Sequence, residues 1–383
     1  MNFEFSDDQK AIRDLAQQIF SDRATDDFLL QFSRTDETYD EELWRTLAQQ
    51  GLLGIAVPEA LGGSGLGLVE LCLVLEEQGR RVAPVPLYAS LVLGALPLAE
   101  FGSEQQQQRY LQPLVAGELK LSAAVAEVAM NAALAPQLQA RREGEHWVLD
   151  GERAVVPDGA VADALLVPAT DDAGQVSFFV VERAQPGVSV TPLPIGLSGE
   201  RAANVSFAGV TLGDDALLGA AGQGEEILEW LVARANVGHC ALQVGVTEEA
   251  MKRTAAYVSE RKQFGIPLGS FQALAMRMAD SYIDVEAIRS TYWLALWRLS
   301  EGLDARAEVR AAKWWACDAA HRVVSTSQHL HGGMGADVEY PIHRFFLLAK
   351  QISYSLGNAS QQLEQLGRLL AEDDALGFRA LEV

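Results

Sequence analysis

The stretch RKQFGIPLGSFQ, residues 261–272, gathers side chains whose types and spacing could hold a nucleotide. The Arg261 guanidinium can make charge-assisted hydrogen bonds to a diphosphate, Phe264 offers an aromatic face for stacking, and Gly265 lets the backbone approach closely. The adenosine diphosphate end of a dinucleotide needs these three features. The alternative is a solvated basic helix end with Phe264 packed into the core.

A second candidate segment is QHLHGGMGADVEYPIHR, residues 328–344. Its glycines predict the end of one helix, and Pro341 predicts the start of the next. His329 and His331 are candidate metal ligands, but they stand two positions apart with no third ligand in view. We therefore predict no metal site.

The charge balance limits the class of partner. The 383 residues include 30 basic and 52 acidic side chains, a net charge of −22. Such a chain repels polyanions, which argues against general nucleic-acid binding, and an anionic ligand needs a local basic patch. The three cysteines are widely spaced, the first residues are acidic, and the apolar run at 87–102 is short and contains Pro97. We expect a cytoplasmic protein without a membrane span.

The hydrophobic periodicity positions these segments in an α+β multidomain protein. We predict an N-terminal helical domain at 1–120, a middle antiparallel β domain at 121–220 and a C-terminal helical bundle domain at 221–383. The predicted strands begin near residues 146, 162, 176, 188 and 203. The predicted C-terminal helices cover 227–258, 271–300, 304–331 and 341–371. This order matches neither a Rossmann fold nor a barrel.

Together these segments resemble the acyl-CoA dehydrogenase family of flavoproteins over essentially the whole chain. The motifs that carry the resemblance are PEALGGSGLGLVELCLVLEEQGR, RKQFGIPLGSFQALAMRMAD and HGGMGADVEYPIHR. The resemblance implies a C-terminal four-helix bundle, assembly into dimers or tetramers, and FAD in a crevice between subunits. It also implies oxidation of an acyl-CoA thioester to the 2,3-enoyl-CoA, with electrons passed to an electron-transfer flavoprotein.

In that family two chains hold each FAD, and one of them supplies the diphosphate and adenine contacts. The residues that match this contribution are Arg261, Phe264, Gln272, Gly332 and Gly333. One departure is His329, which stands where the family usually has Gln. The resemblance therefore implies that this stretch grips half of a cofactor whose flavin lies on a neighbouring chain.

The catalytic base of the family is missing from both positions where its members carry it. The base beyond the glycine turn falls on Leu356, and the base on the first bundle helix falls on Ala235. Leucine and alanine cannot accept a proton. A small insertion in the alignment would bring Arg234 to the second position.

The β domain departs from the family at the same chemistry. The segment that resembles T-E-P-x-A-G-S-D keeps Glu127 but loses its hydroxyl, and the W-I-T that covers the flavin falls on Val155, Val156 and Pro157. Proline removes an N–H donor as well as the hydroxyl. A positioned base is worth about 10² to 10⁴ in rate and each pre-organised oxyanion donor about 10² to 10³, so little intrinsic activity is expected.

Three hypotheses follow. The first is a base-lacking subunit that completes the FAD site of a catalytic paralogue, resembling the heteromeric α2β2 dehydrogenases of steroid side chains. The second is a self-sufficient dehydrogenase whose base is an unaligned acid, Asp337 or Glu229, although Asp337 is equally readable as a helix cap and Glu229 as a surface acid. The third is a non-catalytic acyl-CoA or flavin-binding protein.

Overall fold

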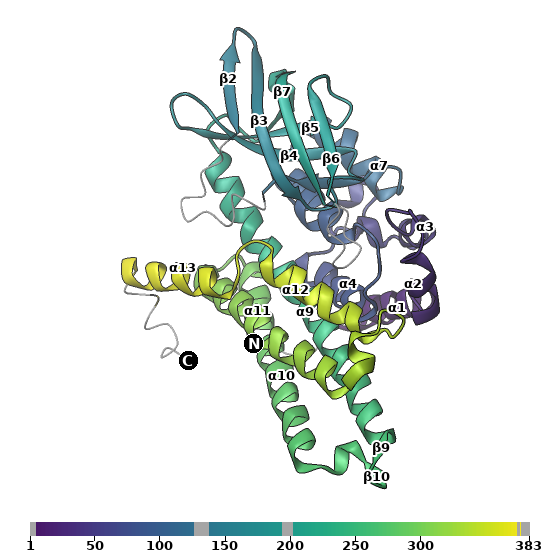
Figure 1. The fold of residues 1–383 in the computed structure, drawn as a ribbon. Helices are drawn as coiled ribbons and strands as arrows, with labels where there is room; N and C mark the ends of the chain where they lie inside the picture. Colours follow the sequence, from purple (N-terminus) through teal and green to yellow (C-terminus); the bar gives the residue numbers. More distant parts are fainter. Residues whose placement is uncertain (1–4, 126–137, 194–201, 374–375, 377–383) are drawn as a thin grey trace. The chain divides into compact units, whose positions relative to one another are not determined.

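The structure, a computed structural model, describes residues 5–125, 138–193, 202–373 and 376 (Figure 1). The chain packs into two compact units. The first comprises residues 1–35, 72–83 and 236–383, and the second comprises 36–71 and 84–235. Helices α4 (Leu68–Arg81) and α9 (Gly224–Glu260) each contribute to both units. The three-domain boundaries stay a prediction from the sequence.

The first unit is helical. Besides parts of α4 and α9 it contains α1 (Asp7–Arg23), α2 (Asp26–Phe32), α10 (Gln272–Ser300), α11 (Arg306–Leu330), α12 (Ile342–Tyr354) and α13 (Ala359–Glu372). Helix α11 packs against α10, α12 and α13. Helix α1 begins as its sequence predicts, because the Ser6 side chain accepts from the backbone of Gln9 while the Gln9 side chain bonds the Ser6 backbone.

The prediction of one helix over 341–371 is wrong, because the chain breaks between α12 and α13. Leu356 and Gly357 adopt left-handed backbone angles, with φ of 57° and 94°. The Asn358 side chain then caps α13 in a capping box with Gln361, and Gln362 donates to the Leu356 carbonyl at 2.9 Å. Glycine followed by a capping asparagine was the signal for this break.

Helices α4 and α9 cross at two glycines in the first unit. A Cβ atom on Gly79 would lie 2.2 Å from the Leu242 carbonyl oxygen, and one on Gly245 would lie 1.9 Å from the Glu76 carbonyl oxygen. Both distances are far below van der Waals contact, so each backbone touches the other directly. Only glycine at these two positions permits this crossing.

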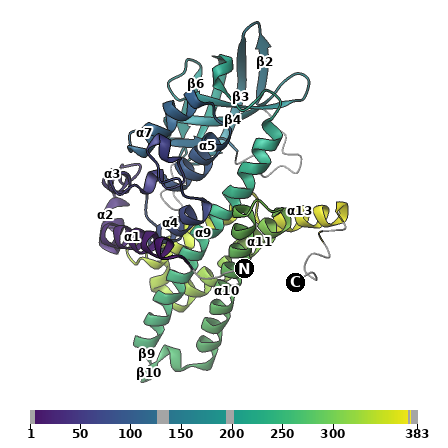
Figure 2. The same ribbon diagram turned by 180° about the vertical axis from the view of Figure 1, so that it is seen from behind.

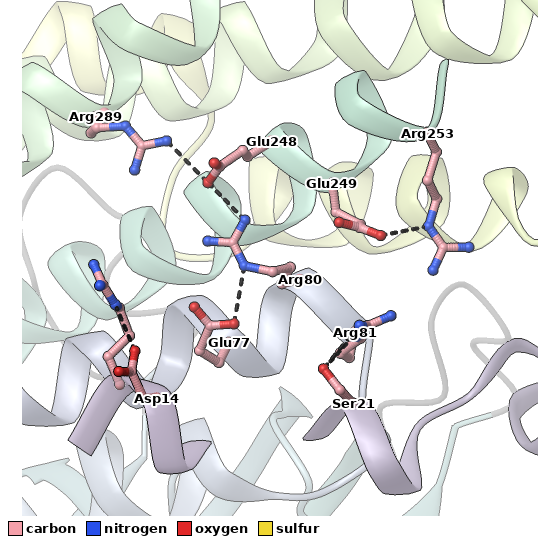
Figure 3. A network of polar contacts seen from close by, with 10 residues as sticks. Asp14, Ser21, Glu77, Arg80, Arg81, Glu248, Glu249, Arg253 and Arg289 are labelled. Atoms are coloured by element: carbon pink, nitrogen blue, oxygen red, sulfur yellow. Dashed lines mark hydrogen bonds and ion pairs between the residues drawn. The ribbon is translucent and has the colours of Figure 1, made fainter. Parts of the chain in front are cut away.

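A partly buried ion network joins the crossing helices to α10 (Figure 3). Arg80 on α4 contacts Glu77 at 3.0 Å and Glu248 on α9 at 2.7 Å, and Glu248 also contacts Arg289 on α10 at 3.0 Å. Glu76, beside this network, is 4% exposed, and its Oε1 has no hydrogen-bond partner among the described residues. Burial raises the pKa of Glu76 to about 7, although Arg289 and Arg80 oppose the shift.

The second unit is built on a sheet. Its strands are β1 (Leu121–Ala123), β2 (Gln139–Glu143), β3 (His146–Val156), β4 (Ala164–Thr170), β5 (Val176–Glu182), β6 (Val188–Pro192), β7 (Ala203–Leu212) and β8 (Leu217–Leu218). They lie in the order β6-β7-β3-β2-β4-β5-β8, with β1 beside β4. The five predicted strands are confirmed. The sheet is antiparallel except where β1 and β2 each pair with β4 in parallel.

Apolar side chains on the sheet form the core of this unit. They include Trp147, Leu149, Phe179, Val205 and Phe207, all buried. Short helices accompany the sheet: α3 (Glu41–Gln49), α5 (Leu96–Phe101), α6 (Glu104–Gln106) and α7 (Gln112–Val115), with π-helical turns at Tyr88–Ala95 and Gln107–Leu111. Within the described residues, no helix is both long enough and apolar enough to cross a membrane.

Glu76→Gln should flatten the pH dependence of stability. The folded state binds the Glu76 proton more tightly than the unfolded state, so this stabilisation is full below about pH 4.5 and is lost as the pH rises through about 7. The amide cannot ionise, so the variant should gain on the order of 3 kcal/mol over wild type at pH 8 and little at pH 5. Urea unfolding at both pH values measures this difference.

Glu248→Gln is the matched control. Burial favours a raised pKa for Glu248, but Arg80 and Arg289 hold it below its ordinary value, so the carboxylate is stabilising. This variant should be less stable than wild type at pH 8. Equal pH slopes for wild type and Glu76→Gln would contradict the assignment.

Candidate functional site

A hairpin between α9 and α10 carries the predicted nucleotide-binding stretch. Strand β9 (Lys262–Gln263) pairs with β10 (Ile266–Pro267), and the two-residue turn between them has φ of 54° at Phe264 and 84° at Gly265. Both views of the fold show this hairpin where α9 ends and α10 begins (Figure 2). Two left-handed residues are what a tight hairpin turn requires, although a bulky side chain at the first is unfavourable.

The side chain of Phe264 points out of the hairpin. It is 93% exposed, and its ring lies edge-on to Phe271 with 6.3 Å between the ring centroids. The alternative in which Phe264 packs into the core is therefore wrong. An aromatic side chain held in solvent on strained backbone has a face free for stacking.

Two basic side chains flank this ring. Arg261 and Lys262 are exposed, and neither makes an ion pair with any residue that the structure describes. The backbone at Arg261 is nevertheless fixed, because its N–H donates to Tyr257 and its carbonyl accepts from Leu268 at 2.8 Å. Gln272, the first residue of α10, is exposed as well. The hairpin thus carries two exposed basic side chains on a chain whose net charge is −22.

The glycine turn packs against the C-terminal turns of α9. These turns directly precede the hairpin in the sequence. Helix α11 ends at Leu330, and Gly332 follows with φ of 61°. The Tyr257 ring stacks on His331 at 4.4 Å, and its hydroxyl lies 4.0 Å from the Met334 sulfur. Tyr257 therefore links the turn to Arg261, because its backbone carbonyl accepts a hydrogen bond from the Arg261 N–H.

The backbone of the turn is open to the outside. Apart from its chain neighbours, a Cβ atom on Gly332 or Gly333 would meet no atom of the described residues within 4 Å. Internal packing consequently gives no reason for glycine at 333, whereas the left-handed φ gives one at 332. His329 is exposed on the last turn of α11. A smooth, open turn of this kind allows a ligand to approach the backbone closely.

The second histidine of this segment is a core residue. His331 is 3% exposed, and its Nδ1 lies 2.7 Å from the Ser327 carbonyl oxygen. Burial lowers the pKa of His331 against the opposing effect of that carbonyl, which favours the neutral ring. Among the described residues no three His, Cys, Asp or Glu side chains gather as a metal site would require.

Neither position of the family base carries a proton acceptor. Leu356 is 2% exposed in its left-handed turn. Ala235 is fully buried, and its carbonyl accepts from the Tyr88 hydroxyl at 3.0 Å. Asp337 and Glu229 are both exposed, and Asp337 accepts from the backbone N–H of Glu339 at 2.9 Å rather than capping α12.

A buried cation that the sequence analysis missed lies near the end of α12. Lys313 on α11 is fully buried and donates to the Ile352 carbonyl at 2.7 Å, with its Nζ 3.5 Å from His239 Nδ1. Burial and Lys313 together lower the pKa of His239 well below its ordinary value. A lysine among the apolar, helically spaced Val309, Ala312 and Ala316 was the available signal.

Residues 155–157, which align with the flavin-covering residues of the family, form hydrogen bonds to other residues of this chain. Val155 and Asp158 have left-handed φ of 52° and 47°, and the pairing of β3 with β7 shifts register between Arg153 and Val156. The Val155 N–H donates to the Asn204 side chain at 3.1 Å, and the Pro157 carbonyl accepts from Ser122. No hydroxyl is present at 155–157. Glu127 lies outside the described residues.

Comparison with known proteins gives three consecutive family-model matches. The acyl-CoA dehydrogenase N-terminal domain matches residues 6–118, the middle domain matches 128–210 and the C-terminal domain matches 222–371. Among curated proteins, the acyl-CoA dehydrogenase FadE27 of Mycobacterium tuberculosis is 37% identical over 98% of this chain and 100% of its own length.

Solved structures are similar over nearly the whole chain. A variant of the Tcur3481–Tcur3483 steroid ACAD is 43% identical with a TM-score of 0.88, covering 95% of this chain and 98% of that one. The ChsE4–ChsE5 complex from Mycobacterium tuberculosis is 37% identical with a TM-score of 0.91, covering 97% and 100%. An FAD complex of PigA is 25% identical with a TM-score of 0.89, covering 97% and 99%. The predicted fold class is confirmed.

Leu356→Glu should destabilise the protein instead of restoring a base. The position is buried in an apolar side chain's place, so an ionised carboxylate there should cost about 3 kcal/mol or more, with a larger loss at pH 8 than at pH 5. Leu356→Gln, which has a similar volume and no charge, separates the cost of polarity from the cost of ionisation. Urea unfolding with an acyl-CoA oxidation assay tests this. A stable, active Leu356→Glu variant would contradict it.

Proposed function

This chain belongs to the acyl-CoA dehydrogenase family, and from that premise we propose that it is the base-lacking subunit of a heteromeric, FAD-dependent acyl-CoA dehydrogenase. Its partner is a catalytic paralogue that holds the flavin and the base. The complex desaturates an acyl-CoA thioester between C2 and C3 and passes electrons to an electron-transfer flavoprotein. FAD, when bound, supplies the two-electron acceptor for this reaction.

The contrast between the hairpin and the base positions carries the proposal. The hairpin presents Arg261, which makes no ion pair among the described residues, and the exposed Phe264 on hydrogen-bonded backbone, as a grip on another chain's cofactor requires. The two base positions, in contrast, are buried apolar residues, Leu356 and Ala235. A chain under selection for its own catalysis would keep the group worth 10² to 10⁴ in rate.

Residues of this chain fit the adenosine diphosphate end of FAD. Arg261 would neutralise the diphosphate, Phe264 would stack, and Gln272 would hydrogen-bond the nucleotide. Gly332 and Gly333 would let the backbone come close, which agrees with the open space beyond both glycines. His329, exposed at the same turn, replaces the usual Gln and could donate one hydrogen bond.

The relatives support a proposal for the substrate class and the assembly. Two of the similar solved structures are the Tcur3481–Tcur3483 steroid ACAD and the ChsE4–ChsE5 complex. We propose by analogy a tetramer of two chain types and an acyl-CoA with a bulky, steroid-type side chain.

Counting flavins tests the subunit role. Purified alone, the chain should carry well below one FAD and show no acyl-CoA oxidation. Co-expressed with its catalytic paralogue, it should co-purify with one FAD per pair of chains and with activity. Stoichiometric FAD and turnover by the chain alone would refute the role. CoA binding without turnover beside every paralogue would favour the non-catalytic binder instead.

Amide substitutions test the self-sufficient alternative in the same assay. Asp337→Asn and Glu229→Gln should leave activity of the complex unchanged, because both side chains are exposed.

Arg261→Gln should weaken FAD retention by the complex about 10-fold to 100-fold, since a hydrogen bond to a charged group is worth roughly 1.5–3 kcal/mol. Phe264→Ala should weaken it similarly through lost stacking. Lys262→Gln is the matched control, because it removes the same charge from the same hairpin and should have a smaller effect. Flavin fluorescence during dilution measures the release. Equal retention by all three variants would contradict the assignment.

A further inference from the structure

A buried histidine lies between the hairpin and the glycine turn in the first unit. His331 follows α11 and directly precedes Gly332, and its side chain is 3% exposed. Its ring stacks on Tyr257 of α9, with 4.4 Å between the ring centroids and 24° between the planes, and Tyr340 contacts it at 5.3 Å. The ring is therefore enclosed by one tyrosine from α9 and one from the segment that leads into α12.

Tyr257 connects this histidine to the hairpin through its own backbone. Its carbonyl accepts from the Arg261 N–H at 2.9 Å, and the Arg261 carbonyl in turn accepts from Leu268 at 2.8 Å. The Tyr257 hydroxyl also lies 4.0 Å from the sulfur of Met334, the residue that follows the two glycines of the turn. The stack of His331 on Tyr257 thus joins the two segments that carry the proposed nucleotide contacts.

The hydrogen bonds of His331 favour one protonation state. Its Nδ1 lies 2.7 Å from the Ser327 carbonyl oxygen, which can only accept, so Nδ1 carries the proton. Its Nε2 is buried and has no hydrogen-bond partner among the described residues. A second proton would create a buried charge and an N–H donor without an acceptor, and both are costly. The neutral ring therefore fits this environment and the imidazolium does not.

The groups around His331 leave this preference in place. The side chains that face the ring are the two tyrosines, and the charges that act on Tyr340 are those of Arg253 and Asp26, which pair with each other at 2.7 Å. Burial lowers the pKa of His331, and the hydrogen bond to Ser327 opposes this shift. An opened turn takes up the proton more readily, so the stabilisation of the closed turn is full above about pH 6.5 and is lost as the pH falls below it.

We propose that His331 is a positioning residue for the FAD contacts of this chain. In its neutral form it holds the glycine turn against Tyr257, so that Gly332 and Arg261 meet the same nucleotide. The inference rests on the proposed function, which makes the adenosine diphosphate end of FAD the ligand of both segments. It adds a regulation to that function, because mild acid loosens the hold on the cofactor.

Two substitutions separate the ring of His331 from its proton. His331→Phe keeps a ring against Tyr257 and cannot titrate, and the Ser327 carbonyl keeps a partner because the backbone N–H of residue 331 also donates to it at 3.3 Å. His331→Asn keeps a side-chain N–H donor and loses the ring. In the complex with the catalytic paralogue at pH 8, His331→Asn should release FAD about 2-fold to 10-fold faster than wild type through lost stacking, whereas His331→Phe should match wild type.

The pH profile distinguishes positioning from simple packing. The wild-type complex should release FAD faster at pH 5 than at pH 8, and this difference should shrink in His331→Phe, which has no proton to gain. His321→Gln is the matched control, because it removes an exposed histidine of α11 whose pKa is also lowered and should keep the wild-type profile. Flavin fluorescence during dilution measures the release, and near-UV circular dichroism checks that each complex is folded.

The outcomes separate this role from the subunit role. Equal FAD release by wild type and His331→Asn, or the same pH dependence in wild type and His331→Phe, would overturn the positioning role. Either result in a complex that carries one FAD per pair of chains leaves the subunit role standing. A wild-type complex without FAD would refute both roles together, and flavin counting detects that case before any variant is compared.

Discussion

The helical unit depends on the close crossing of α4 and α9. With Gly79 and Gly245 at the crossing, each backbone reaches the other without an intervening side chain. That approach brings Arg80 within 2.7 Å of Glu248 and removes water from the neighbouring carboxylates. The same geometry that creates the ion network leaves Glu76 dehydrated, which is why its pKa is raised while that of Glu248 is lowered. Backbone contact thus sets the electrostatics of this part of the protein.

A buried lysine contacts α12 shortly before the position that aligns with the family base. Lys313 is buried against the end of α12, where the carbonyl dipoles of the helix favour a cation. A few residues later, Leu356 has a left-handed backbone conformation and a buried side chain. The bundle therefore stabilises this turn by apolar packing and by a capping ammonium.

Binding and chemistry are separable in such a chain because they depend on different structures. Ligand contacts at the hairpin need exposed side chains on fixed backbone, and Arg261 and Phe264 provide them at the end of α9. Proton transfer needs a desolvated acid at one defined point, which a single substitution removes. A subunit can therefore lose catalysis while keeping every helix, turn and surface that assembly requires. Its contribution to the reaction would then be made through the partner's cofactor.

Local patterns were sufficient for much of this protein. The capping box at Ser6, the five strands, the helix end before Gly332 and the family motifs were all predictable, because each depends on residues within a few positions of one another. The burial of individual side chains and the charge state of buried groups were not predictable, since both depend on contacts between segments that are distant in the sequence. Only the packed helices show that Phe264 is exposed and that Glu76 is buried beside the close crossing at Gly245. The same holds for the hydrogen bonds that Lys313 and Gln362 donate to carbonyl groups at and after the end of α12. Sequence determined which elements form, and long-range contact decided which side chains meet water.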